Sequence, residues 1–327
     1  MPDLWSMHGL TVRCDDVALD ARRAPLDSTP DLTVRVLGHG LVPAVDERPS
    51  GRVLARVEDQ ETIWLSVLEP TRTDAPMPHP VVDIHFHGVA SASYDTVHRT
   101  VDVVLAPDAE EAFAPVLING TIIAVVLALL GHPVLHASAV SVDVAGEARV
   151  VAFVGSSGMG KSTLATLTCR DGATLFTDDV LRTEIVDDVV LAWPGATATR
   201  LRPAAAALAA QAATSVATTA DGRTSAAMPL SPDRAVPLAA IVVPQPDRES
   251  DVITVRRLDG VRAVLTLAGF PRVLGWRDAT TAGQAHRHWG EIARRVPIMT
   301  ARVPWGPPFD DDLGAALLQE ILATAEL

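Results

Sequence analysis

The chain has 327 residues, of which 48% are hydrophobic and 4% aromatic, and it carries a formal net charge of −13 at pH 7. This length predicts two domains, or one domain with a large extension, and the acidic balance argues against nucleic acid as the main partner because phosphate backbones bind basic faces. Cysteines are too few for a disulfide framework, the longest apolar stretch is too short for a membrane span, and the start lacks a signal-peptide pattern, so we expect a cytoplasmic protein without a membrane partner.

The first part of the chain has a β-rich pattern. Residues 32–37 and 62–67 alternate apolar and polar side chains with the period of a strand. Residues 71–80 contain three prolines and predict a loop. We therefore expect a β-rich N-terminal domain over residues 1–107, and a second domain of α/β type over residues 108–327, which makes the whole chain α+β.

Two histidines in the N-terminal part suggest a metal site. His85 and His87 alternate on a predicted strand, so both imidazoles point to one face, and two such histidines can bind Zn²⁺. A zinc site needs a third or fourth ligand, and the sequence marks none nearby. Two ordinary strand histidines on a polar face are therefore the favoured interpretation.

A helix, a hairpin and a histidine precede the most informative motif. Residues 108–130 have a helical pattern, with acidic residues at the end where the helix dipole favours them. Residues 134–142 predict a strand, and a turn at 145–147 leads back into the next strand. His136 lies on the first of these two strands, and a hydrogen-bonded core histidine is the alternative to a functional one.

The second strand of this hairpin, residues 150–154, leads into a complete Walker A pattern, G-x-x-x-x-G-K-[ST], and helix-forming residues follow. Its glycines let backbone N–H groups turn around phosphate oxygens, and the helix start adds the positive end of its dipole. Lys161, the only lysine in the chain, is predicted to reach the outer phosphates, and the Ser162 hydroxyl to bind Mg²⁺. The predicted nucleotide-binding residues are Gly155, Ser156, Ser157, Gly158, Met159, Gly160, Lys161, Ser162 and Thr163.

An acidic pair follows the next predicted strand. Residues 173–177 form that strand, and Asp178 and Asp179 come directly after it. Acidic residues at such a strand end, near a phosphate loop, are where Mg²⁺ and the attacking nucleophile are managed. One carboxylate can hold the metal or its water while the other accepts a proton from a hydroxyl group. A helix cap followed by a turn is the alternative interpretation.

Two arginines and a long alanine-rich segment follow. Arg200 and Arg202 are candidate contacts to phosphate or to an acidic substrate, with surface salt bridges as the alternative. Residues 204–220 begin with a helical pattern and predict either a mobile lid over the acceptor site or a solvated loop. The remaining pattern predicts strands at 238–243, 252–255 and 297–303, helices at 261–274, 279–295 and 310–327, and His286 and His288 on a helix surface.

The order His136, phosphate loop, Asp178-Asp179 resembles the kinase domain of HPr kinase/phosphorylase and its relatives, which belong to the phosphoenolpyruvate-carboxykinase-like branch of phosphate-loop folds. The resemblance covers residues 110–200 well and the rest of the C-terminal part loosely. It implies that Lys161 binds the β- and γ-phosphates of ATP and that Ser162 and Asp179 hold Mg²⁺. It also implies that Asp178 takes the proton of an acceptor serine, and that His136 lies beside the phosphates and contacts the acidic pair.

Two departures bear on the acceptor. The loop ends Lys-Ser-Thr where the bifunctional enzymes usually have Lys-Ser-Glu, and residues 193–203 stand where those enzymes carry a signature of phosphorolysis. The chain is more similar to HPr-kinase-like serine kinases of ribosomally made, modified peptides, including lasso-peptide kinases. The resemblance therefore implies a kinase that uses ATP and Mg²⁺ to phosphorylate a serine of a precursor peptide, with the N-terminal domain as a candidate for recognising that peptide.

Three alternatives stay open from the sequence. The acceptor can instead be an HPr-type small protein or free serine. The chain can also be a regulator that binds a nucleotide without transferring phosphate. The oligomeric state is open as well, with a homo-oligomer as one option.

Overall fold

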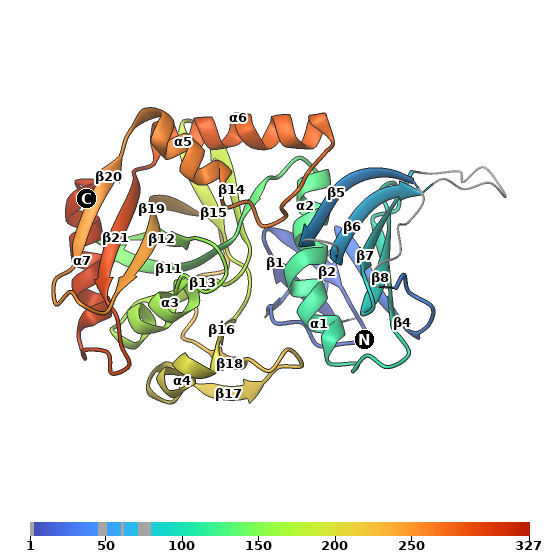
Figure 1. Cartoon of the computed structure of the whole chain (residues 1–327), viewed down its shortest axis with the longest axis horizontal. Coiled ribbons are helices and arrows are strands. Elements are labelled where there is room, and N and C mark those ends of the chain that lie inside the picture. The colour runs from blue at the N-terminus through green and yellow to red at the C-terminus, as the bar shows by residue number, and fades with distance from the viewer. Residues whose placement is uncertain (1–2, 45–50, 60–61, 71–79) are drawn as a thin grey trace. The chain divides into compact units, whose positions relative to one another are not determined.

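The computed structural model, shown in Figure 1, describes residues 3–44, 51–59, 62–70 and 80–327, so all but the last residue of the loop predicted at 71–80 lies outside the described residues. It is a strand-rich mixed α/β structure. Contacts divide the chain into one unit of Met1–Gly131 with Val273–Gln284, and another of His132–Arg272 with Ala285–Leu327. The division between these units does not coincide with the predicted domain boundary between residues 107 and 108.

The first unit contains a nine-stranded sheet in the described residues, in the order β3-β1-β2-β4-β9-β8-β7-β6-β5. The strand β4 pairs in parallel with both of its neighbours, and the other pairs are antiparallel. The predicted strands at 32–37 and 62–67 are confirmed as parts of β4 and β6. The strands are β1 Leu4–Met7, β2 Leu10–Arg13, β3 Arg22–Arg23, β4 Leu32–His39, β5 Gly51–Asp59, β6 Thr62–Pro70, β7 Val81–Phe86, β8 Ala90–Asp95 and β9 Thr100–Leu105.

The helical segment of the first unit begins later than the sequence predicts. It consists of α1 (Phe113–Leu117), a π-helical turn (Ile118–Ile122) and α2 (Ile123–Leu129). The start at residue 108 is wrong because the acidic residues before Phe113 lie in turns closed by short-range backbone hydrogen bonds, such as the one from Ala109 N–H to Ala106 O. None of the helices in the described residues is long and apolar enough to cross a membrane.

The second unit contains a mixed sheet and a small antiparallel one, as far as the chain is described. The larger sheet has the order β10-β14-β15-β19-β12-β11-β13, and β21 with β20 extends it from β19. The smaller sheet has the order β16-β18-β17. The strands are β10 Val134–Leu135, β11 Ala137–Val144, β12 Glu147–Val154, β13 Thr174–Thr177, β14 Leu181–Val186, β15 Val189–Trp193, β16 Ala198–Leu201, β17 Ser215–Thr218, β18 Thr224–Ala227, β19 Val236–Asp247, β20 Thr254–Leu258 and β21 Ile298–Pro304.

The strand β12, at the centre of the larger sheet, is buried on both of its faces. Val151 and Phe153 pack in a core with residues of α3 and α7, whereas Val150, Ala152 and Val154 pack in a core with residues of α5 and α6. Figure 1 shows these helices around the sheet. The helices of this region are α3 Lys161–Arg170, α4 Ala206–Ala212, α5 Gly260–Ala268, α6 Ala279–Arg295 and α7 Leu313–Ala325. Because a doubly covered strand cannot shift its register without exposing apolar side chains, the end of β12 is a firmly held starting point for the loop that follows.

Several predicted elements are confirmed and others are corrected. The helix at 279–295 and the strands at 238–243 and 297–303 are found in α6, β19 and β21. The helix predicted at 261–274 ends at Ala268, because Gly269 and Pro271 do not continue it. A solvated loop at 204–220 is wrong, since a 3₁₀ turn, α4 and β17 occupy it. The strand predicted at 134–142 is interrupted at His136, whose N–H donates to Phe270 O instead of to the sheet.

Candidate functional site

The predicted phosphate loop forms the turn between β12 and α3. Gly158 and Gly160 have φ angles of 92° and 86°, in the left-handed region that favours glycine. The helix α3 begins at Lys161. Gly160, at the cap position, has no side chain to accept a hydrogen bond from the first N–H groups of α3, so these groups are placed to bind an anion such as phosphate.

Two side chains also bond to the loop, one from within it and one from outside. The N–H of Ser156 donates to Sδ of Met159 at 3.1 Å, and the hydroxyl of Ser157 accepts from Arg202 at 2.9 Å. Thr163, in the first turn of α3, is buried and lines the cavity above the loop together with Ser157 and Ser162. The structure therefore gathers the predicted nucleotide-binding residues on one continuous turn that borders a cavity.

Lys161 is buried inside this turn. Its Nζ donates to the carbonyl oxygens of Gly155 at 2.8 Å and Ser156 at 3.1 Å. Burial lowers the pKa of Lys161 to about 8, although the charges of Asp178 and Asp179 act in the opposite direction. A buried ammonium group that lines a cavity is well suited to a ligand with several negative charges, because such a ligand restores the favourable environment of the charged form.

Asp178 lies next to the hydroxyl predicted to bind metal. Its Oδ1 accepts from the hydroxyl of Ser162 at 2.9 Å and from the hydroxyl of Ser138, and its Oδ2 accepts from the backbone N–H of Arg200 at 2.9 Å. The side chain is only 4% exposed. These donors are two hydroxyl groups and one backbone N–H, all of them neutral groups. Sequence reasoning missed Ser138, whose only signal is its position two residues after His136, on the strand next to β12.

Asp179 is held in a different way. Its Oδ2 accepts from the guanidinium groups of Arg200 and Arg272, each at 2.8 Å, and its Oδ1 lies 3.3 Å from Nε2 of His136. Burial by itself would raise the pKa of Asp179, but Arg272, His136 and Arg200 together hold it well below its ordinary value. Burial lowers the pKa of His136, against the influence of Asp179. Asp179 therefore neutralises two arginines, which leaves it poorly suited to hold a metal ion as well.

The hydroxyl of Ser162 and the carboxylate of Asp178 offer the hard oxygen atoms that Mg²⁺ prefers. Mg²⁺ is usually held by one or two protein groups together with phosphate oxygens and water, so this small donor set fits an ion that arrives with a nucleotide. Within the described residues, no group of three or more His, Cys, Asp or Glu side chains is placed to hold a metal. The donor set therefore fits Mg²⁺ bound to a phosphate. Of the two aspartates, Asp178 is the one that accepts a hydrogen bond from Ser162.

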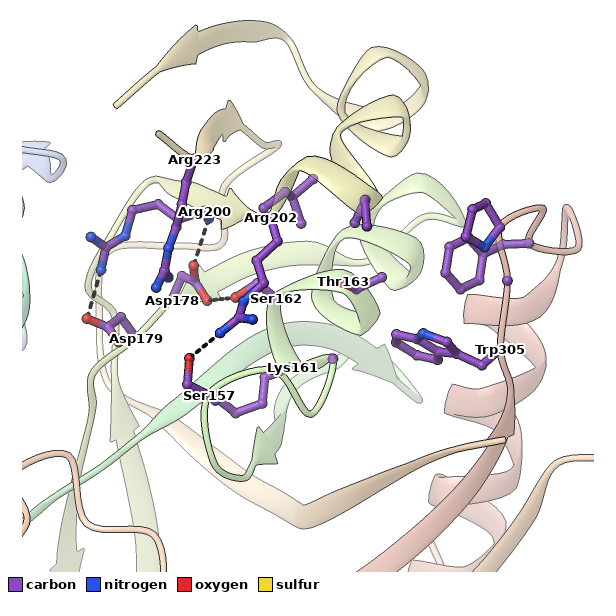
Figure 2. Close-up of a pocket in the computed structure, with 18 of the residues that line it drawn as sticks. Ser157, Lys161, Ser162, Thr163, Asp178, Asp179, Arg200, Arg202, Arg223 and Trp305 are labelled. Carbon is purple, nitrogen blue, oxygen red and sulfur yellow. Dashed lines mark hydrogen bonds and ion pairs between the residues drawn. The ribbon is translucent and has the colours of Figure 1, made fainter. Parts of the chain in front are cut away.

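Arginines gather around the same cavity. Arg200 and Arg202 line it as predicted, and Arg223 and Arg248 line it without having been predicted. Figure 2 shows Arg200, Arg202 and Arg223 around Asp178 and the phosphate loop. Arg223 comes from the turn between β17 and β18, a segment whose sequence gives no sign of a binding role. A cluster of cations in a chain of net charge −13 indicates a strongly anionic ligand.

An aromatic pair lines another part of the cavity. Trp305 follows β21, and its ring meets that of Phe309 edge to face, with the centroids 5.3 Å apart. The Trp305 ring also touches the phosphate loop, because a Cβ atom placed on Gly160 would lie 2.3 Å from its edge. Figure 2 shows Trp305 on the side of the α3 start away from Asp178 and Asp179. Sequence reasoning missed both aromatic residues.

Among the described residues, the other histidines named in the sequence analysis, His85, His87, His286 and His288, do not line this cavity. In the first unit, His85 bonds to Ser91 and His87 bonds to Ser66 and to Ala44 O, which agrees with two structural histidines. His286 is exposed as predicted. The prediction for His288 is wrong, because the residue is half-buried, its Nε2 lies 2.7 Å from the hydroxyl of Thr183, and burial lowers its pKa to about 4.

Comparisons with known proteins found distant structural similarity, but no protein-family model and no curated protein matches the chain. Among solved structures, the Hpr(Ser) kinase/phosphatase from Coxiella burnetii is similar, with 11% sequence identity and a TM-score of 0.31, over 59% of this chain and 99% of that chain. A similarity at this level does not transfer the role of any residue to this chain.

Proposed function

We propose that this chain is a phosphotransferase that uses Mg·ATP to phosphorylate a serine hydroxyl, most specifically that of a peptide. The observation that carries the proposal is the convergence of three features on one cavity. They are a Walker A turn with its buried Lys161, a carboxylate at Asp178 that bonds to Ser162, and a wall of arginines. Phosphoryl transfer depends mainly on positioning and on charge stabilisation, which these features supply.

The proposed step is an in-line displacement. The serine oxygen forms a bond to the γ-phosphorus while the bond from that phosphorus to the β-phosphate oxygen breaks, and ADP leaves. The serine proton passes to the carboxylate of Asp178, which accepts hydrogen bonds from the hydroxyls of Ser138 and Ser162 and from the backbone N–H of Arg200. Lys161 and the N–H groups at the start of α3 stabilise the phosphate oxygens.

The metal site and the arginines complete the proposal. Ser162 would hold Mg²⁺, which neutralises part of the phosphate charge when it is bound. Asp179 has another task, which is to hold Arg272 and Arg200, the second of which lines the cavity. This arrangement differs from the predicted one, in which Asp179 is a metal ligand.

The most specific part of the proposal is the peptide acceptor, which rests on the resemblance described in the sequence analysis. We would mix the protein with Mg·ATP and, in turn, with precursor-like serine peptides, HPr and free serine, and follow the gain of phosphate by mass spectrometry. A gain on a peptide is the expected result. Transfer to HPr or to free serine alone would contradict the peptide assignment, and ATP binding without transfer to any acceptor would favour a nucleotide-binding regulator.

Asp178→Asn is the variant that tests the chemistry. It keeps the size of the side chain and one of its two acceptor oxygens, but it cannot accept the serine proton at neutral pH. We expect transfer to fall by about 10²- to 10⁴-fold, while the dissociation constant for ATP in the absence of Mg²⁺, measured by calorimetry, changes little. The exposed Asp251→Asn is a matched control in the same unit and should leave both quantities unchanged. Normal transfer by Asp178→Asn would show that Asp178 is not the base.

A further inference from the structure

The two ends of the cavity differ in the chemistry they present. Figure 2 shows Asp178 and Asp179 at one end and Trp305 at the other, with the phosphate loop and the start of α3 between them. The acceptor hydroxyl must approach the γ-phosphate from the end that holds the proton-accepting carboxylate. The nucleoside is attached to the α-phosphate, at the opposite end of the triphosphate chain. A nucleotide bound on the loop in this direction therefore carries its base toward Trp305.

The aromatic end is built to accept a flat apolar group. Trp305 and Phe309 stand at an interplanar angle of 90°, and both pack, with Ala205, against the core that includes α3 and α7. The backbone N–H of Trp305 donates to Asp247 O at 2.8 Å, which ties the residue to the end of β19. The indole ring packs directly against Gly160, which fixes the distance of the ring from the phosphate loop. The ring is therefore a half-buried, positioned wall of the cavity.

We propose that the corner formed by Trp305 and Phe309 is the binding subsite for the base of the nucleotide, which stacks on the indole ring. The proposal rests on the function proposed above and adds where the nucleoside lies. Stacking of a base on an aromatic side chain typically stabilises binding by about 1–3 kcal/mol, or roughly 5- to 150-fold in affinity. It is also tolerant of the identity of the base, because every base presents a π-face.

The side chains at this corner also limit selectivity. Trp305, Phe309 and Ala205 offer apolar surface, so the subsite holds a base mainly through its face and reads little of its hydrogen-bonding edge. A site of this kind discriminates weakly between purines. A large difference in affinity between two bases requires polar groups in the site that the wrong base leaves unpaired. We therefore expect ATP and GTP to bind with affinities within about threefold of each other.

The test separates the base from the phosphates. Calorimetry would measure the affinities of the full chain for Mg·ATP, Mg·GTP and magnesium tripolyphosphate, which has the phosphates but no base. In Trp305→Ala we expect the affinity for ATP and for GTP to fall about tenfold, and the affinity for tripolyphosphate to stay within about twofold. Trp305→Phe, which keeps a ring, should retain most of the affinity for ATP. Trp64→Ala, which removes an exposed tryptophan of the other unit, is the matched control.

Three outcomes would overturn the proposal. An equal loss for ATP and tripolyphosphate in Trp305→Ala would show that the ring only supports the loop, and Trp305→Phe would then lose as much as Trp305→Ala. An unchanged affinity for ATP would show that the base lies elsewhere. A rise in the KM for a peptide acceptor, without a change in the affinity for ATP, would assign the corner to the acceptor. Because all three affinities are measured without transfer, a failure of the proposed kinase activity would be seen separately.

Discussion

The carboxylate end and the aromatic end of the cavity are held in place by different forces. Asp178 and Asp179 are positioned by hydrogen bonds and ion pairs that come from four separate segments, whereas Trp305 and Phe309 are positioned by packing against a core. Charged contacts in a buried site have strict geometry, and removal of one partner leaves the other desolvated. Packing contacts are graded, so that smaller rings retain part of the effect. Substitutions at the carboxylate end should therefore cause an abrupt loss of phosphate transfer or of stability. Substitutions at the aromatic end should weaken nucleotide binding gradually.

The largest effect is expected at Lys161, on the loop between the two ends. Lys161→Met removes the buried ammonium group that is predicted to bind the outer phosphates, so transfer should fall by about 10³-fold or more. A phosphate-transfer assay with the best acceptor would measure the loss. Retention of more than a tenth of the activity would contradict the role of Lys161.

Since Lys161 is the only lysine of the chain, it also gives an independent check. Its pKa of about 8 makes a larger share of the amine reactive at neutral pH than an exposed lysine would offer. An amine-reactive reagent should therefore label Lys161 besides the chain's α-amino group, and Mg·ATP should protect Lys161 alone. Equal labelling with and without Mg·ATP would place the nucleotide away from this side chain.

Asp179→Asn should mainly reduce stability. The substitution leaves Arg200 and Arg272 without the charge that they share, and loss of one partner of a buried ion pair costs about 3 kcal/mol or more. Chemical denaturation at pH 7 would measure the free energy of unfolding. Asp15→Asn, which breaks an exposed pair with Arg13, is the control and should cost less than about 1 kcal/mol.

The difference in the free energy of unfolding between the wild type and Asp179→Asn should depend on pH, and the pKa of Asp179 determines how. The folded protein holds that pKa well below its ordinary value, because Arg272, His136 and Arg200 outweigh the effect of burial. The stabilising contribution is thus fully present above about pH 4, where the carboxyl is ionised in the unfolded chain as well, and it is lost as the pH falls through the folded-state pKa. The stability of the wild type and Asp179→Asn should therefore converge only below about pH 4. Convergence between pH 5 and pH 7 would contradict the depressed pKa.

Gly160→Ala should have an intermediate effect that links the loop to the aromatic end. A Cβ atom at this position would clash with the Trp305 ring, and the φ angle of 86° is itself strained for alanine. Together we expect a loss of about 2 kcal/mol in stability. In the double variant Gly160→Ala/Trp305→Ala the clash is gone and only the backbone strain stays, so the two substitutions should be less than additive. Full additivity, measured by denaturation, would show that the ring does not touch the loop.

The sequence predicts well what is encoded locally. The loop at 155–163 and the acidic pair after the next strand are contiguous motifs, and the structure places them where the pattern indicates. Arg272 and Ser138 reach the acidic pair, and Trp305 reaches the cavity, through tertiary folding from the α5–α6 connection, β11 and the residue after β21, so no local spacing marks them. Acidic residues before a helical pattern likewise do not tell whether they lie in its first turn or in the turns before it.

The smallest effect is expected at Arg202, whose guanidinium group donates to Ser157 of the loop and is exposed. A solvent-exposed contact between an arginine and a phosphate contributes about 1 kcal/mol to the free energy of binding. Arg202→Ala should therefore raise the KM for ATP about fivefold and change kcat little. Arg202→Lys should recover part of the loss, because it keeps the charge without the planar fork. The loss should also shrink as salt is raised from 0.05 M to 0.5 M, since screening weakens an exposed charge far more than a buried one. A salt-independent loss in kcat would instead place Arg202 with the buried groups of the carboxylate end.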